Sequence, residues 1–398
     1  MRVLFLSQVL PYPLDAGPKM RSYYVLRYLA KQHEVTLVTF VRDSDKPEDV
    51  AHLAEFCHKV ITVPIQRSRV RDVGYLAQSV LSRHPFLILR DQVPAMREQI
   101  KQLVTSHRFE AIHADQLWMA QYALQAKAAL PQAKLILDQH NAVYLIPQRM
   151  AGERANPLLR RFLTGESKRL ASYEVEMWRR FDHVVWVTAE DQQAVLAMIE
   201  PTQNGRAPAT VIPICANPSQ TEPVVRTANP RRVTFLGGLH WPPNAQGVVW
   251  FAKEVFPQVR AAVPDAILTV IGKSPPTGIE GKGVEITGYV DDPRPYLTET
   301  AVFIVPLHAG GGMRVKIIDA WSWALPMVST TIGAEGIETT HGEDILIADS
   351  ASDFAQAVIQ VLQNPALGEK LSRQGRQTVL EKYDWQKIYP AWDNIYCK

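Results

Sequence analysis

The stretch PLHAGGGMRVKIIDAW, residues 306–321, is the most informative part of the chain. An unbroken apolar run, 301–305, precedes it and predicts a strand of a parallel sheet that is buried on both faces. A second apolar run, 325–330, follows it and predicts another strand. Strand, glycine loop, helix and strand form one βαβ unit, so this half of the chain is predicted to be an α/β domain.

The glycine loop has the features of an anion site. Gly310, Gly311 and Gly312 let the backbone approach a ligand at the start of the predicted helix, where free N–H groups and the helix dipole favour negative charge. Arg314 and Lys316 add two positive charges in the first turn, and Asp319 follows on the same helix face as Lys316. We expect a diphosphate on the glycines and the two cations, with Asp319 accepting hydrogen bonds from a ribose. The alternative is a tight turn followed by a Lys316–Asp319 ion pair.

Length and composition describe an ordinary globular protein of two domains. The chain has 398 residues, of which 46% are hydrophobic and 21% charged, and a net charge of +3 that is too small to indicate nucleic-acid binding. Its three cysteines are scattered and form no CxxC, which suits a reducing cytoplasm. No run of apolar residues is long enough to cross a membrane, and we expect the opening segment, residues 2–7, to be a strand rather than a signal peptide.

The first half repeats the same strand–helix rhythm, which predicts a doubly wound parallel sheet. Strands are expected over residues 2–7, 33–40, 60–64, 111–113, 134–138, 184–188 and 210–213. Such sheets bind ligands at the carboxyl ends of their strands. The polar or small residues that follow strands here are Gly17, Lys19, His113, Asp115, Asp138, His140 and Asn141.

A polar, proline-rich segment, 217–230, separates the two halves. We expect an N-terminal domain over 1–216, this linker, a C-terminal domain over 231–375, and a last segment, 376–398, that returns to the first domain. The second domain is also predicted to be doubly wound, and the absence of a well-placed GxGxxG argues against a nicotinamide dehydrogenase.

Taken together, these motifs resemble the GT-B glycosyltransferases. They are closer still to the retaining family-four (group 1) enzymes and, within these, to sugar transferases of bacterial exopolysaccharide loci. The resemblance implies two Rossmann-like domains facing across a cleft. It rests on Pro11–Pro13 with Gly17, His33–Val35, His113–Gln116, His140–Asn141, Phe235–Gly238, Trp241–Asn244, Gly288–Tyr296 and Gly310–Ala320.

The resemblance also implies roles for individual residues. His140 matches the family histidine beside the transferred sugar and, with Asp319, is the expected catalytic residue. Gly288–Val290 would hold the nucleotide base. The expected donor-binding residues are Gly17, Gly237, Gly238, Asn244, Gly288, Tyr289, Val290, Gly310, Gly311, Gly312, Met313, Arg314, Lys316 and Asp319, and the expected acceptor-binding residues are Lys19, His113, Asp115 and Asn141.

The chain departs from the broader family at the donor site. The family carries two glutamates eight residues apart, where this chain has Gly311 and Asp319. The usual arginine and lysine after the first strand of the second domain are absent, since residues 238–241 are Gly-Leu-His-Trp. The positive charge is instead found at Arg314 and Lys316, as in the exopolysaccharide subgroup.

Glycosyl transfer from a nucleotide sugar builds negative charge on the departing diphosphate, and Arg314 and Lys316 could neutralise it without a metal. We therefore expect no metal and no other cofactor; His113 and His140 are far apart in sequence, and the Asp291-Asp292 pair lies in the base-binding tract. We also expect retention of anomeric configuration, because the sequence places no carboxylate–histidine pair for in-line inversion. The alternatives are a nucleotide-sugar epimerase, a glycogen-type phosphorylase, or a non-catalytic nucleotide- or glycan-binding module.

The acceptor is expected to be a glycan, a lipid-linked glycan or a small molecule. Basic residues interleaved with apolar ones occur at Arg67–Ala77 and at 154–180. These segments are either solvated helix faces or surfaces for an anionic membrane or a lipid diphosphate. A cytoplasmic protein is expected in both cases, held peripherally at the inner face of the membrane in the second.

Overall fold

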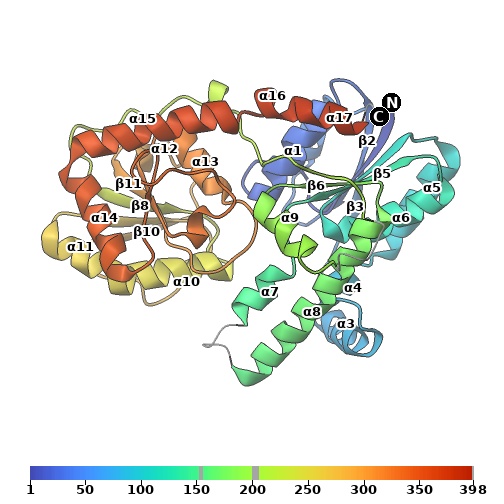
Figure 1. Ribbon diagram of the computed structural model, residues 1–398, viewed down its shortest axis with the longest axis horizontal. Helices are drawn as coiled ribbons and strands as arrows, with labels where there is room; N and C mark the ends of the chain where they lie inside the picture. The colour runs from blue at the N-terminus through green and yellow to red at the C-terminus, as the bar shows by residue number, and fades with distance from the viewer. Residues whose placement is uncertain (152–155, 200–205, 397–398) are drawn as a thin grey trace. The chain divides into compact units, whose positions relative to one another are not determined.

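The computed structural model describes residues 1–151, 156–199 and 206–396. The described chain divides into two compact units, one formed by Met1–Ile214 with Tyr389 onward, and the other by Cys215–Ile388. Each is an α/β unit built on a parallel sheet (Figure 1). The two doubly wound sheets expected from the sequence are therefore confirmed.

The first unit contains a seven-stranded sheet in the order β3-β2-β1-β4-β5-β6-β7, with every described pair parallel. Its strands are β1 Arg2–Ser7, β2 Glu34–Val41, β3 Lys59–Pro64, β4 Ala111–Asp115, β5 Lys134–Gln139, β6 His183–Trp186 and β7 Ala209–Val211. Its helices are α1 Gly17–Leu29, α2 Pro47–Ala54, α3 Arg69–Ser82, α4 Phe86–Arg90, α5 Pro94–Ser106, α6 Ala120–Ala129, α7 Leu145–Met150, α8 Pro157–Arg180, α9 Ala189–Leu196 and α17 Asp393–Tyr396.

The second unit contains a six-stranded parallel sheet in the order β10-β9-β8-β11-β12-β13. Its strands are β8 Arg232–Leu236, β9 Ile267–Ile271, β10 Val284–Gly288, β11 Thr300–Val305, β12 Met327–Ser329 and β13 Leu346–Ile347. Its helices are α10 Pro242–Trp250, α11 Phe256–Ala262, α12 Arg294–Leu297, α13 Val315–Ser322, α14 Ala351–Gln363, α15 Pro365–Lys382 and α16 Trp385–Ile388, with a π-helical turn at Phe251–Val255.

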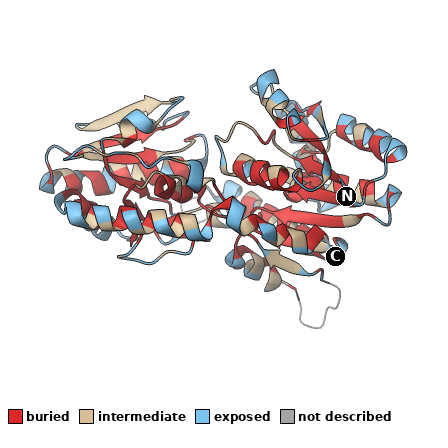
Figure 2. Ribbon diagram, turned by 90° about the horizontal axis from the view of Figure 1, so that it is seen from above, coloured by how far each residue is buried: buried red, intermediate tan, exposed pale blue. Residues whose placement is uncertain are grey.

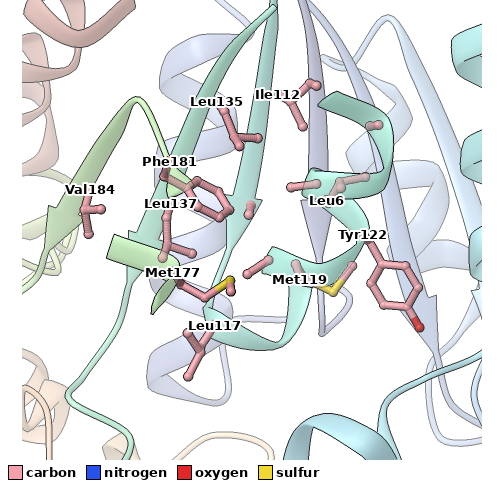
Figure 3. Packing of buried hydrophobic residues seen from close by; sticks show 14 of the residues in the cluster. Leu6, Ile112, Leu117, Met119, Tyr122, Leu135, Leu137, Met177, Phe181 and Val184 are labelled. Carbon is pink, nitrogen blue, oxygen red and sulfur yellow. The ribbon is translucent and has the colours of Figure 1, made fainter. Parts of the chain in front are cut away.

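Burial explains why these sequences form central strands. Five consecutive residues of β1 and all of β4 and β11 are buried, as expected for central strands of a parallel sheet that helices cover on both faces (Figure 2). In the first unit, Leu6, Ile112 and Leu135 of the sheet pack in one core with residues of α6 and α8 such as Tyr122 and Met177 (Figure 3). These rigid strands fix the positions of the polar residues at their carboxyl ends.

The C-terminal segment is divided between the units. Helix α15 continues to Lys382 within the second unit, and the chain joins the first unit only from Tyr389. The sequence placed this change at residue 376, inside what the structure shows as one helix. The expected linker, 217–230, is part of the second unit. Among the described helices, none is long and apolar enough to cross a membrane.

Candidate functional site

The glycine loop of the second unit connects β11 to α13 and needs glycine at two positions. Gly310 and Gly312 have φ angles of 123° and 71°, in the left-handed region that residues with a Cβ rarely adopt. Helix α10 lies close to the start of this loop, because a Cβ on its Gly247 would lie 2.3 Å from the carbonyl oxygen of Pro306. The middle of α10 therefore packs against the backbone just after β11, where the loop begins.

Arg314 is part of the loop itself. Its guanidinium donates hydrogen bonds to the carbonyl oxygens of Gly311 and Gly312, and lies 3.8 Å from a carboxylate oxygen of Glu335. The residue is only 7% exposed. The sequence predicts that Arg314 presents its charge to a diphosphate; in this structure the side chain turns back and holds the loop in shape.

Lys316 connects α13 to the end of β8 and the first turn of α10. Its Nζ donates to Oδ1 of Asn244 at 2.8 Å and lies 4.4 Å from the ring centroid of Phe235. Asn244 in turn donates to the carbonyl oxygen of Gly238 at 2.8 Å. A Cβ on Gly237 would be 2.9 Å from Nζ, so the missing side chain leaves room for the lysine. The structure thus places three other predicted donor-binding residues, Gly237, Gly238 and Asn244, near the ammonium group of Lys316.

The two ionisable side chains on α13 have shifted pKa values. Burial, followed by the charge of Arg314, lowers the pKa of Lys316 to about 7, against the opposing effect of Asp319. Burial raises the pKa of Asp319 to about 7, with Lys316 acting in the other direction. A bound anion would favour the charged lysine and raise its pKa again, so this site can take up a proton when it binds an anion.

The predicted base-binding tract lies at the same edge of the sheet. Gly288 ends β10 with a φ of 72°, and Tyr289 follows with 55% of its surface exposed. The Nζ of Lys273 lies 4.3 Å from the Tyr289 ring centroid. Strand β10 is separated from β8 by β9 alone, and the carboxyl ends of parallel strands share one edge. An exposed aromatic ring is therefore available there for a flat ligand group. Val290 is partly exposed and Met313 is buried.

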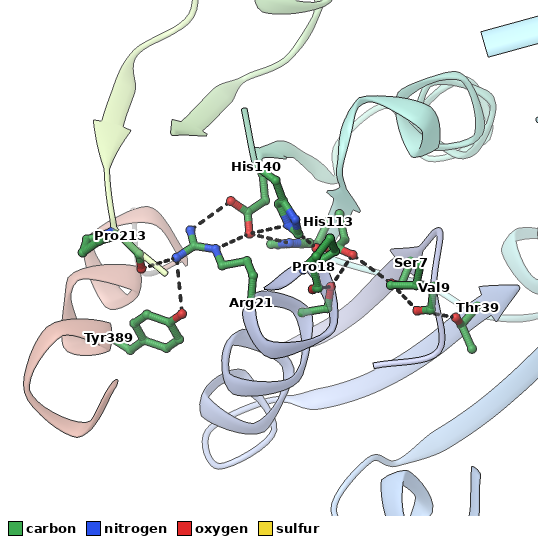
Figure 4. A network of polar contacts seen from close by, with 12 residues as sticks. Ser7, Val9, Pro18, Arg21, Thr39, His113, His140, Pro213 and Tyr389 are labelled. Carbon is green, nitrogen blue, oxygen red and sulfur yellow. Dashed lines mark hydrogen bonds and ion pairs between the residues drawn. The ribbon is translucent and has the colours of Figure 1, made fainter. Parts of the chain in front are cut away.

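The first unit contains a buried polar network at the carboxyl ends of β1, β4 and β5 (Figure 4). Asp115, at the end of β4, is fully buried. Its Oδ2 accepts hydrogen bonds from the hydroxyls of Ser7 at 2.8 Å and Ser22 at 2.7 Å. Its Oδ1 lies 2.8 Å from Nε2 of His140, the residue after β5. The expectation that no carboxylate–histidine pair is placed is wrong: Asp115 and His140 form one.

This pair fixes the state of the histidine ring. Burial tends to raise the pKa of Asp115, but the charge of His140 and the hydrogen bonds from His140 and Ser22 outweigh it and hold that pKa below its usual range. An ionised Asp115 can only accept, so Nε2 of His140 carries the proton. The Nδ1 of His140 is buried and has no hydrogen-bond partner among the described residues. When the ring is neutral, Nδ1 is therefore an acceptor.

Asp138 is balanced by Arg21 of α1. The guanidinium binds both carboxylate oxygens, at 3.0 and 2.9 Å, and also donates to the carbonyl oxygen of Pro213 at 2.7 Å. His113 stacks on Phe5 with ring centroids 4.3 Å apart and is fully buried. Burial lowers the pKa of His113 to about 4, although Asp138 and Asp115 oppose the shift, so this ring is neutral at pH 7.

Three donor groups of this network, from His113, Asp115 and Asp138, lie within 4.8 Å of one another, a spacing that a metal ion could use. His140 lies beside this cluster, because its Nε2 and that of His113 are each 3.9 Å from Oδ2 of Asp138. Both carboxylates already accept hydrogen bonds, and Arg21 supplies positive charge next to Asp138. The network is thus organised around a guanidinium.

The four predicted acceptor-binding residues do not share one environment. His113 and Asp115 have no exposed surface. Lys19 pairs with Asp15 at 3.0 Å and its side chain is 16% exposed, and Asn141 is also partly exposed. Gly17, the predicted donor-loop residue, begins α1 after Ala16, which supplies no side-chain cap.

Comparison with known proteins gives the following findings. Residues 230–364 match the family model "Glycosyl transferases group 1". A protein of Klebsiella pneumoniae, described as an uncharacterized 44.6 kDa protein in the cps region, is 21% identical over 404 residues, which cover 98% of each chain. The lipopolysaccharide core biosynthesis glycosyltransferase LpsE of Rhizobium meliloti is 27% identical over 117 residues, which cover 29% of this chain and 34% of LpsE.

Among solved structures, HepE of Anabaena in complex with UDP and glucose superposes with a TM-score of 0.69 at 14% identity, covering 100% of this chain and 99% of HepE. At this identity the likeness concerns the fold. The chain has the GT-B fold, and residues 230–364 match the group 1 glycosyltransferase model.

Proposed function

We propose that the chain is a group 1 glycosyltransferase, which moves a sugar from a nucleotide-diphosphate donor to a glycan or lipid-linked acceptor with retention of anomeric configuration. The observation that carries the donor assignment is the position of Lys316: its ammonium, Asn244, Gly237 and Gly238 meet at the N-terminal ends of α10 and α13. The polysaccharide context is supported by the lipopolysaccharide relative.

The second unit would bind the leaving group. The diphosphate would lie at the glycine loop, with Lys316 as the charged donor and the backbone N–H groups of α13 around it. Arg314 would hold the loop in place, and Asp319, one turn further along, would accept hydrogen bonds from the ribose. The Tyr289 ring would face the base. Charge stabilisation by fixed cations and backbone dipoles replaces a metal in this mechanism.

The first unit would contribute His140 at the sugar. In a retaining transfer the acceptor oxygen bonds to the anomeric carbon on the face from which the phosphate oxygen departs, and the acceptor proton passes to that phosphate oxygen. His140 would hydrogen-bond the sugar through Nδ1, since Nε2 is engaged by Asp115. Asp115 is then a positioning residue that sets the tautomer and orientation of the ring.

Incubation with UDP-, GDP- and dTDP-sugars tests the proposal. Slow release of the nucleoside diphosphate together with free sugar is expected for at least one donor, and NMR of a transfer product should show the donor's anomeric configuration. An isomerised nucleotide sugar would mark an epimerase, and binding without turnover would mark a non-catalytic module; either would overturn the proposal. An inverted product would make His140, with Asp115 behind it, a general base.

A further inference from the structure

Helix α3 of the first unit is exposed along almost its whole length. Of its fourteen residues, Ser79 alone is buried. The face of α3 opposite Ser79 carries large apolar side chains: Val70 is 83% exposed, Val73 68%, Val80 63% and Leu81 86%. Their spacing of i, i+3, i+10 and i+11 places them on one face of the helix, away from Ser79. We refer to these four residues as the α3 stripe.

Further exposed apolar residues lie on α8, which α4 connects to α3. The first turn of α8 exposes Leu158 at 80% and Leu159 at 51%. The short helix α4 packs against α3, and its Phe86 ring lies 6.4 Å from that of Phe162 in α8. With Leu76 included, these two segments hold seven of the twelve exposed large apolar residues in the described chain. Scattered apolar residues need no explanation, whereas a gathered set of this kind marks an interaction surface.

The charges around this surface are mostly positive. Arg69, Arg71 and Arg83 lie on or beside α3, and Arg160 and Arg161 follow the two leucines of α8; all five are exposed. Asp72 is the acidic residue of α3. The acidic side chains nearby are already paired: Asp91 lies 2.6 Å from Arg67, and Glu166 lies 3.0 Å from Arg169. The partner of this surface must therefore offer an apolar interior that the side chains can enter and negative charge at its surface.

We propose that α3 and the first turn of α8 form a docking surface for an anionic lipid bilayer, on which α3 lies parallel to the membrane plane. The α3 stripe enters the boundary between headgroups and acyl chains, and the arginines remain at the level of the phosphates. Gly74, which has open space around it, and the lack of packing make α3 a weak helix in water, and insertion of its apolar face stabilises it. The proposal goes beyond the transfer reaction and does not depend on it.

Vesicle co-sedimentation of the full chain tests the proposal. Phosphatidylcholine vesicles with an equal share of phosphatidylglycerol should bind the protein at low salt, and pure phosphatidylcholine vesicles should bind it far less. The triple variant V73N/V80N/L81N should lose about tenfold or more in partition coefficient. R69Q/R71Q/R83Q should lose about fivefold for each arginine, and the remaining binding should depend less on salt, since Arg160 and Arg161 are still present.

Matched controls come from exposed residues elsewhere. Val225 is 87% exposed, so V225N should bind vesicles as the wild type does, and R108Q should behave likewise. All of these variants should keep the wild-type circular dichroism, because their side chains bury little surface. Equal sedimentation of the wild type and V73N/V80N/L81N would overturn the proposal. So would a lipid-free dimer, seen by sedimentation velocity, that dissociates in the triple variant, since a second copy of the chain would then cover this surface.

Discussion

Replacing Lys316 by methionine removes one ammonium group while keeping most of the side chain's length and apolar surface. In the free protein this ammonium donates to Asn244 and lies above Phe235. If a diphosphate binds as we propose, the lysine makes one charge-assisted hydrogen bond to it, and such a bond contributes about 1.5–3 kcal/mol. The expected loss in donor affinity is therefore about 10- to 150-fold.

The same variant should not destabilise the fold. The folded-state pKa of Lys316, about 7, lies below the ordinary value of 10.5, because burial disfavours the ammonium. Between pH 10.5 and pH 7 the unfolded chain holds a proton on this lysine that the folded protein does not. The free energy of unfolding therefore decreases as the pH falls from 10.5 towards 7. At pH 7 the lysine therefore opposes folding, and Lys316→Met should unfold at the wild-type temperature or above it. A variant with lower affinity and undiminished stability separates a binding role from a structural one.

Isothermal titration with UDP and GDP measures the affinity, and repeating it in buffers of different ionisation enthalpy measures proton uptake. Above pH 7 the wild type should take up a proton on binding, and its affinity should fall by at most tenfold per pH unit. The Lys316→Met variant should take up fewer protons on binding than the wild type. Lys282, which is exposed, provides the matched control as Lys282→Met. Unchanged affinity of Lys316→Met for every nucleotide that the wild type binds would refute the donor site.

Three further results are expected. Arg314→Ala should weaken donor binding and also lower the unfolding temperature, because the guanidinium holds two loop carbonyls; a variant with wild-type stability would contradict this structural role. His140→Ala should lower kcat by about a hundredfold or more with little change in donor Kd, and Asp115→Asn should lower kcat by about tenfold and shift its pH profile; loss of donor binding instead of turnover would count against both roles. Activity should survive EDTA, and activity that vanishes and returns with magnesium or manganese would overturn the metal-free mechanism.

The sequence predicts the strands and the glycine loop of the second unit from local patterns. Parallel strands bring their carboxyl ends to one edge, and there Gly237, Asn244 and Lys316, which the resemblance names as donor-binding residues, lie together. The sequence does not predict the direction in which the Arg314 side chain points. Its sequence position beside three glycines suggests a ligand contact, but the carbonyl oxygens of a loop with positive φ angles also attract a cation, and only the folded backbone shows that they do so here.

The buried network of the first unit depends on register, which the sequence does not display. The strands β4 and β5 pair Asp115 with Asp138, so two carboxylates become neighbours in a buried sheet. Two like charges in that position would be costly without compensation. Residues distant in sequence compensate these charges: Arg21 of α1 pairs with Asp138, and His140 hydrogen-bonds Asp115. Asp138 and His140 are close in sequence, but the carboxylate that accepts the hydrogen bond from His140 is that of Asp115, on another strand.

The charge balance of this network bears on the proposed chemistry. Asp115 and Asp138 contribute two negative charges and Arg21 one positive charge, while His113 is neutral at pH 7. With His140 neutral, one negative charge is left uncompensated behind its ring. A sugar that becomes cationic in the transition state would meet the Nδ1 side of that ring, and the field of the buried carboxylate would stabilise it. The network thus places buried negative charge behind His140, and glycosyl transfer develops positive charge at the anomeric carbon.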